Sequence, residues 1–217
     1  MAVTATRRRS CLVKRCVLSP ERYDPRRALS VSDGGVRLGD LVTAVTESVP
    51  PGANHERSIV WDTSDVKEGF VVGRKPVTTV VGSTKKRVFP GDVLISRLRP
   101  YLRQVAFVDE GVPQADSARL LCSTEFFVLR SPGGRSIAFL AAYLLSEPVQ
   151  RVLSASQEGG HHPRFDIETL LALPVPTSLV EIREEISQAV EAAIARYRES
   201  VTTIATLIEN AESHINA

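Results

Sequence analysis

The most constraining feature of this sequence is the absence of glycine and proline from residues 178–215. Because both residues interrupt helices, the segment is predicted to form one long helix of roughly 55 Å. Apolar side chains recur along it in alternating steps of three and four residues, which is the spacing of a coiled-coil seam. The predicted seam residues are Val190, Ile194, Tyr197, Val201, Ile204, Ile208, Ala211 and Ile215. A single helix cannot bury this seam, so we expect a partner helix from a second copy or another protein.

A second segment, residues 85–103, combines a predicted buried strand with clustered cations. The apolar run Val93-Leu94-Ile95 is typical of a buried strand, and Pro90-Gly91-Asp92 predicts a turn before it. The basic residues around it are Lys85, Lys86, Arg87, Arg97, Arg99 and Arg103, with Tyr101 among them. Residues 74–103 hold eight basic residues and one acid although the net charge of the chain is only +2, so the positive charge is concentrated here. Such a strand is suited to binding a polyanion.

Between these features the sequence predicts a sheet followed by helices. Short runs rich in β-branched and aromatic residues are separated by turn residues, which favours a mixed or antiparallel sheet over regular βαβ units. The predicted strands are residues 58–61, 70–72, 77–81, 93–96, 105–108 and 125–129. Trp61 and Phe126 are expected in the core.

Helical patterns begin after residue 134. Residues 136–146 have the apolar spacing of a buried helix face. Pro148 suits the first turn of a second helix, and Asp166 can cap a third. Residues 173–176 (LPVP) are expected to be extended, because each proline disfavours helix at the residue before it. The predicted fold class is therefore α+β: a twisted mixed or antiparallel sheet with flanking helices, followed by a long C-terminal coiled-coil helix.

The predicted organisation has three parts. Residues 1–12 form a flexible basic tail, residues 13–177 a globular domain, and residues 178–217 the long helix. A second apolar stripe early in this helix (Ile182, Ile186, Ala189 and Ala193) is placed to pack on the domain.

Several chemistries are disfavoured. Three cysteines, Cys11, Cys16 and Cys122, do not suggest a disulfide framework, and their spacing does not suggest zinc. Residues 69–75 resemble a phosphate-binding loop but are one residue short, and no nucleophile elbow or dinucleotide fingerprint is present. No apolar run approaches the roughly 20 residues that span a bilayer. We expect a soluble, cytoplasmic binding protein, not an enzyme, without a metal or cofactor of its own.

Several segments, taken in order, resemble the DNA specificity subunit of type I restriction-modification systems. They are ERYDP (21–25), RLGDL (37–41), PGDVLISR (90–97), STEFFVLR (123–130), the glycine-rich loop at 159–164 and the LPVP link at 173–176. The resemblance covers about residues 20–215 and is to a half-length form with one target-recognition domain. It departs from the family at residues 177–181 (TSLVE), where Pro-x-x-Glu-Gln is common.

The resemblance implies a non-catalytic protein that reads one half of a bipartite DNA sequence. In the family, spacer helices pair as an antiparallel coil that fixes the distance between the two halves. DNA adenine methyltransferase subunits, which use S-adenosylmethionine, dock on it, and the systems act in phage defence. A half-length member is expected to form a homodimer that reads two copies of one half-site.

The candidate DNA-binding residues fall into three groups. The first is expected to contact bases or phosphates, the second mainly phosphates, and the third to enter a groove from the glycine-rich loop. In that order they are Arg97, Arg99, Tyr101 and Arg103; Lys85, Lys86 and Arg87; and Gly160, His161, His162 and Arg164. The alternative for each group is an ordinary solvated surface or loop.

The predicted partner interface consists of the seam residues Val190, Ile194, Tyr197, Val201, Ile204, Ile208 and Ile215. The exposed seam also leaves a different class of function open. In that alternative the chain is a protein-interaction adaptor that has the same fold but does not read DNA.

Overall fold

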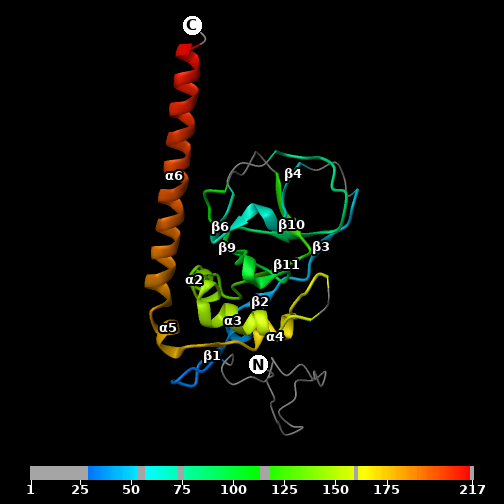
Figure 1. The fold of residues 1–217 in the computed structure, drawn as a ribbon, viewed down its shortest axis with the longest axis vertical. Coiled ribbons are helices and arrows are strands. Elements are labelled where there is room, and N and C mark those ends of the chain that lie inside the picture. Colours follow the sequence, from blue (N-terminus) through cyan, green and yellow to red (C-terminus); the bar gives the residue numbers. More distant parts are fainter. Residues whose placement is uncertain (1–28, 53–56, 73–75, 113–117, 159–160, 216–217) are drawn as a thin grey trace.

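The computed structural model describes residues 29–52, 57–72, 76–112, 118–158 and 161–215 (Figure 1). The predicted tail at 1–12, Cys11, Cys16, the segment 21–25 and Gly160 lie outside these ranges. Two sheets pack face to face, and helices cover the outer face of the larger sheet (Figure 1). The predicted α+β class, with a mixed sheet and a long C-terminal helix, is confirmed.

The larger sheet has six strands and contains the strand at the centre of the basic segment. Its strands, in spatial order, are β2 (Thr43–Ala44), β11 (Phe126–Arg130), β8 (Val93–Ser96), β9 (Val105–Phe107), β6 (Gly69–Val71) and β5 (Val66–Lys67). Every residue of β8 is buried. Val93 and Ile95 face the helices, whereas Leu94 faces the second sheet. The continuous apolar run therefore reflects burial on both faces.

The second sheet has four strands, in the order β3 (Ser48–Val49), β7 (Lys85–Val88), β10 (Arg119–Ser123) and β4 (Ser58–Trp61). Trp61 and Phe126 are fully buried between the sheets, as predicted. The strand predicted at residues 77–81 is wrong, because only Thr78 forms a bridge, to Ser58, and Val80 is 73% exposed. β-branched residues alone do not make a strand where no neighbouring strand accepts its hydrogen bonds.

The basic segment crosses from one sheet to the other. Lys85, Lys86 and Arg87 were predicted to form a charged end of the strand that is now β8. They belong instead to a separate strand, β7. In the turn that follows, Gly91 has a left-handed φ of 91°. The Asp92 carboxylate, 1% exposed, accepts hydrogen bonds from the Phe89 amide at 2.9 Å and from Arg130 at 2.7 and 2.8 Å.

Helices pack on the outer face of the six-stranded sheet. They are α1 (Leu38–Leu41), α2 (Phe139–Leu145), α3 (Glu147–Ala155) and α4 (Ile167–Leu171). Pro148 lies in the first turn of α3, and Asp166 caps α4 by accepting a 2.6 Å hydrogen bond from the Thr169 amide, as expected for both. β1 (Val36–Arg37) pairs with β12 (Pro174–Val175), within the predicted LPVP extension.

The C-terminal segment forms two helices instead of the single one predicted. They are α5 (Thr177–Glu181) and α6 (Arg183–Ile215), with Ile182 outside helical geometry between them. The first half of α6 packs on α2, where Ile186, Val190 and Ile194 contact the main core. The second half extends past the domain (Figure 1). None of the described helices has the length and apolarity needed to cross a membrane.

Arg198 fastens α6 to the sheet at the point where the helix leaves the domain. Its guanidinium donates two hydrogen bonds to the Asp109 carboxylate, one of them at 2.6 Å, and another to the Val71 carbonyl at 3.3 Å. The two side chains are only 14% and 10% exposed. One residue earlier, the Tyr197 ring packs on Phe70 with centroids 4.3 Å apart.

Neutralising this ion pair from one side is expected to destabilise the protein. Asp109→Asn leaves the Arg198 charge poorly solvated and unpaired, so the free energy of unfolding should fall by about 3 kcal/mol. Urea denaturation measures this value. The matched control is Glu147→Gln, which removes an exposed pair with Arg151 and should cost less than about 0.5 kcal/mol. Equal effects of the two substitutions would contradict the assignment.

Candidate nucleic-acid interface

The two segments predicted to bind DNA meet where β8 leaves the six-stranded sheet. Leu98 forms a β-bridge with Arg164, and the Phe165 amide donates to the Arg97 carbonyl at 3.2 Å. The loop itself closes by reciprocal hydrogen bonds between the backbones of Glu158 and Arg164, at 2.8 and 2.9 Å. The fold thus brings together residues that are more than 60 positions apart in the sequence.

After this bridge the chain forms a short, conformationally restricted projection. Arg99 and Arg103 have left-handed φ values of 49° and 51° and flank the 3-10 helix η5 (Pro100–Leu102). Such values are uncommon for residues with a Cβ and indicate local strain. Pro100 is buried, whereas Tyr101 is 61% exposed. An exposed aromatic ring is therefore displayed between two arginines.

Glu125 joins the two segments through a double ion pair. Its carboxylate accepts from Arg97 Nε at 3.1 Å and from Arg164 Nε and Nη2 at 2.9 and 2.7 Å. Hydrogen bonds from Arg164 and then Arg97 lower the pKa of Glu125 to about 2. The carboxylate therefore remains charged at any pH at which the protein is expected to work.

The cations of β7 all have intramolecular partners. Lys86 Nζ donates to the Phe126 carbonyl at 2.7 Å, and burial lowers the pKa of this ammonium group. Lys85 pairs with Asp62 at 3.4 Å, and Arg87 lies 3.9 Å from Glu47. Their predicted contact with phosphates stays a prediction, but sequence reasoning missed that each already has a structural contact.

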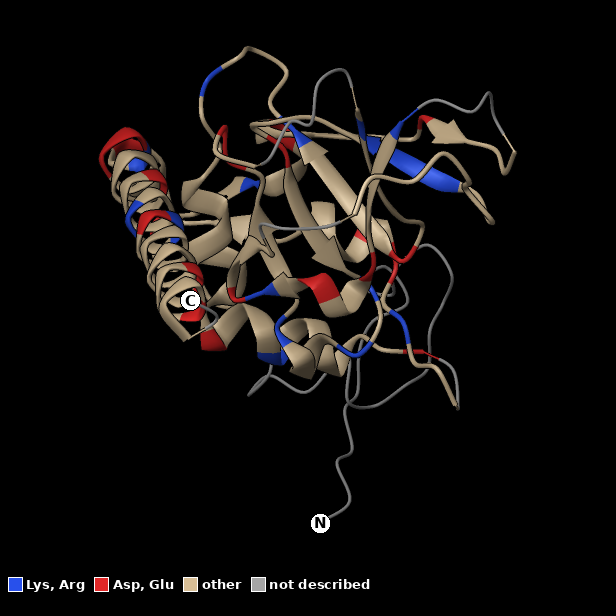
Figure 2. Cartoon of the chain, turned by 90° about the horizontal axis from the view of Figure 1, so that it is seen from above, with Lys and Arg blue, Asp and Glu red and all other residues tan. Residues whose placement is uncertain are grey.

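Acids from distant parts of the chain lie beside most of the predicted DNA-binding cations. Arg103 also has such a partner, since its Nε donates to Glu68 at 2.9 Å. Figure 2 shows β7 as a largely blue strand with red segments elsewhere in the same half of the molecule. Among the described residues, the Arg99 side chain has no acidic partner, and His161 and His162 are exposed near the end of the loop. The surface is therefore less positive than the sequence alone suggests.

The predicted helix seam divides into two parts. Ile194 is buried in the core of its own chain, which corrects its assignment to a partner interface, whereas Val190 is only partly buried against the same core. Tyr197 contacts Phe70 but is still 47% exposed. The remaining seam residues Val201, Ile204, Ile208 and Ile215 are exposed by 47–82%, and Leu207, which lies off the predicted seam, is exposed as well.

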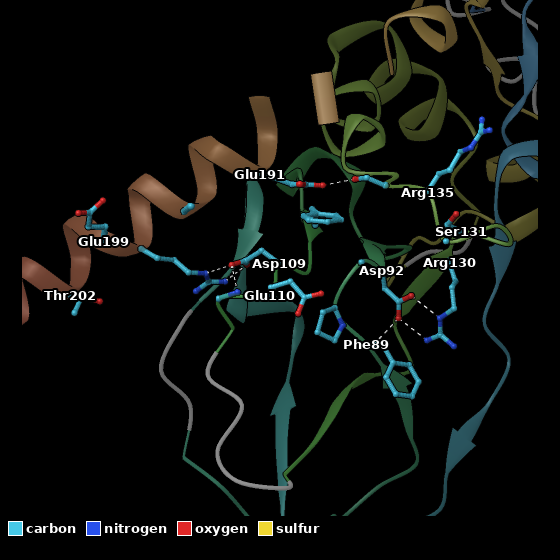
Figure 3. Close-up of a pocket in the computed structure, with 18 residues that line it drawn as sticks. Phe89, Asp92, Asp109, Glu110, Arg130, Ser131, Arg135, Glu191, Glu199 and Thr202 are labelled. Atoms are coloured by element: carbon cyan, nitrogen blue, oxygen red, sulfur yellow. Dashed lines mark hydrogen bonds and ion pairs between the residues drawn. The ribbon is translucent and has the colours of Figure 1, made fainter. Parts of the chain in front are cut away.

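A cavity of about 830 Å³ lies between α6 and the turns of the two sheets (Figure 3). Its lining includes Asp92, Asp109, Arg130 and Glu191, and several of these residues are already engaged in ion pairs or hydrogen bonds. The sequence did not predict it, because its walls come from segments between residues 89 and 202.

No group of three or more His, Cys, Asp or Glu side chains in the described ranges is arranged to hold a metal ion. Cys122 is fully buried, and burial raises the pKa of its thiol to about 12, so it is a poor nucleophile.

No protein-family model matches this sequence, and no curated protein matches it. Solved structures do match. The HsdS subunit from Thermoanaerobacter tengcongensis aligns at 25% identity with a TM-score of 0.56, over 85% of this chain and 48% of that chain. A structure from work on complex assembly and conformational transition of the type I R-M system aligns at 24% identity with a TM-score of 0.57 and the same coverage.

These alignments define the class of fold. The chain has the fold of the specificity subunits of type I restriction-modification systems, as the sequence motifs indicated. It spans about half the length of the two chains it matches.

The Glu125 ion pairs predict a specific dependence of stability on pH. A pKa lowered from 4.5 to about 2 on folding adds stability above pH 4.5, and this is lost as the pH falls toward 2. Glu125→Gln should therefore be less stable than the unmodified protein near neutral pH, and the difference should shrink below pH 4.5. Urea denaturation across this range measures it. A difference that does not change with pH would contradict the pairing.

Proposed function

We propose that this chain is a non-catalytic DNA-recognition subunit of a type I-like restriction-modification system. It binds half of a bipartite duplex target through the surface formed by residues 97–103, residue 158 and residues 161–164. The observation that carries the proposal is the specificity-subunit fold, together with half-buried arginines and an exposed tyrosine where these two segments meet. DNA adenine methyltransferase subunits, which supply S-adenosylmethionine chemistry, are the proposed protein partners.

The proposed assembly is a homodimer formed through the exposed end of α6. A specificity subunit with two recognition domains would contain one recognition domain and one long helix in each half. The present chain has one of each, and its alignment covers 48% of the solved chains. Val201, Ile204 and Ile208 leave an apolar stripe in water, and pairing with a second helix removes it. By two-fold symmetry the dimer reads two copies of one half-site in opposite orientations.

DNA binding is tested by measuring the affinity for duplex DNA by fluorescence anisotropy at several salt concentrations, alone and with a cognate methyltransferase. Affinity should fall steeply with salt. Arg99→Ala should make the slope of log K against log[salt] shallower by about 0.9 for each bound protomer, because one phosphate contact is lost. Arg196→Ala, which removes an exposed cation from α6, is the control. Absence of salt-dependent binding under both conditions would rule the proposal out.

The dimer is tested separately by light scattering of the purified chain. Ile204→Asp places a charge on the exposed stripe and should shift the protein to a monomer. Thr203→Asp, at an exposed position beside the stripe, should leave the mass of a dimer. A dimer that survives Ile204→Asp would contradict the proposed interface.

The adaptor alternative differs from this proposal in its prediction for DNA binding. Dimerisation or partner binding would persist after Arg97→Ala, while no DNA affinity would be found for the unmodified chain. The exposed apolar stripe on α6 is the observation that supports this alternative.

A further inference from the structure

The arginines at the candidate interface differ in how many of their donors are already used. Arg164 donates through Nε and Nη2 to Glu125 and through Nη1 to the His162 carbonyl at 3.1 Å, so all three nitrogens are engaged. Arg97 donates only through Nε, to Glu125. Its Nη1 and Nη2 have no partner within the described ranges, and 36% of its side-chain surface is exposed.

Arg97 is also held in place by its backbone. It directly follows the buried strand β8, its amide donates to the Glu125 carbonyl at 3.0 Å, and its carbonyl accepts from the Phe165 amide. The Nε contact then restrains the outer torsions of the side chain. Little conformational entropy remains to be lost when the terminal nitrogens bind a ligand.

Glu125 restrains Arg97 without cancelling its charge. Two guanidinium groups share this one carboxylate, so the three side chains together carry a charge of +1. Lys86, which also interacts electrostatically with both Arg97 and Glu125, adds to the positive potential. The free end of Arg97 is therefore directed and still cationic.

We propose that Arg97 reads a guanine in the major groove through Nη1 and Nη2, with Glu125 and Arg164 as positioning residues. Guanine presents two acceptors, O6 and N7, at a spacing that a guanidinium matches with paired donors, and the other base edges do not offer this pattern. With Nε held by Glu125, the end-on pair Nη1 and Nη2 is the one left to bind. This deepens the proposed function and rests on it.

The remaining cations have different parts in this arrangement. Arg99, without an acidic partner in the described ranges, contacts phosphate and adds affinity without sequence preference. Arg103 pairs with Glu68 at an exposed position. Arg164 holds the loop against β8 through Glu125 and does not touch DNA bases.

The experiment selects a preferred target from duplex DNA with randomised positions, using the full chain with its methyltransferase partner when required. Affinities are then measured for the selected duplex and for duplexes in which each guanine is replaced. At one guanine per half-site, 7-deazaguanine, which lacks N7, should weaken binding by about tenfold. Inosine, which keeps O6 and N7 and lacks only the minor-groove amino group, should bind as guanine does.

Arg97→Lys keeps the charge but loses the paired donors. It should weaken the preference at that one position, leaving preferences at the others, while affinity for unrelated duplex falls by less than about threefold. Glu125→Gln should weaken the same preference, because the side chain of Arg97 is less restrained. Arg99→Ala should lower affinity for all duplexes equally.

The outcomes distinguish the failure of the guanine contact assigned to Arg97 from the failure of the proposed recognition function. If the protein selects a sequence but Arg97→Lys keeps every preference, or 7-deazaguanine is tolerated at every position, the assignment of Arg97 is wrong and the recognition function stands. If no sequence is selected and binding does not depend on salt, both proposals are wrong. The 7-deazaguanine measurement uses the unmodified protein, so it remains decisive if a variant fails to fold.

Discussion

The buried carboxylate of Asp92 links the two sheets at the turn between β7 and β8. It binds the Phe89 amide and the Arg130 guanidinium at once, which ties the turn after β7 to strand β11. The same turn is covered by Phe89, whose ring lies 4.9 Å from Arg87 and 4.7 Å from Arg130. Strand β8 begins at the next residue and Arg97 directly follows this strand, so this interaction anchors the start of the strand that leads to Arg97.

The elements predicted well from the sequence were those that local physics determines. β8 is apolar throughout because both of its faces are buried, and α3 and α4 follow from Pro148 and Asp166 at their first turns. β7 was missed because three of its four residues are charged. Its cations are accommodated by partners such as Asp62, which no local pattern reveals.

The candidate site likewise has features that the sequence predicted and features that it did not. The sequence analysis named both residues 97–103 and the loop near Arg164 as candidate DNA-binding segments, and the backbone bridge between Leu98 and Arg164 joins them. The part played by Glu125 was not foreseen, because a single acid at a strand start carries no signal of its partners. Similarly, the apolar period of α6 is continuous from Val190 onward, so it does not reveal which residues the domain covers. Only tertiary packing separates Ile194, which is buried, from Ile204, which is exposed.

Pairing of surface cations with acids has a consequence for how such a protein finds its site in a genome. Any duplex attracts unpaired arginines and lysines, and millions of unrelated positions compete for the protein in proportion to that attraction. Carboxylates such as Glu125, Glu68 and Glu47 reduce the positive potential of this surface, and under the proposed function this would shorten the time spent on wrong sequences. In a DNA-recognition subunit, such acids would lower the total affinity for DNA and raise the share of bound time at the correct site.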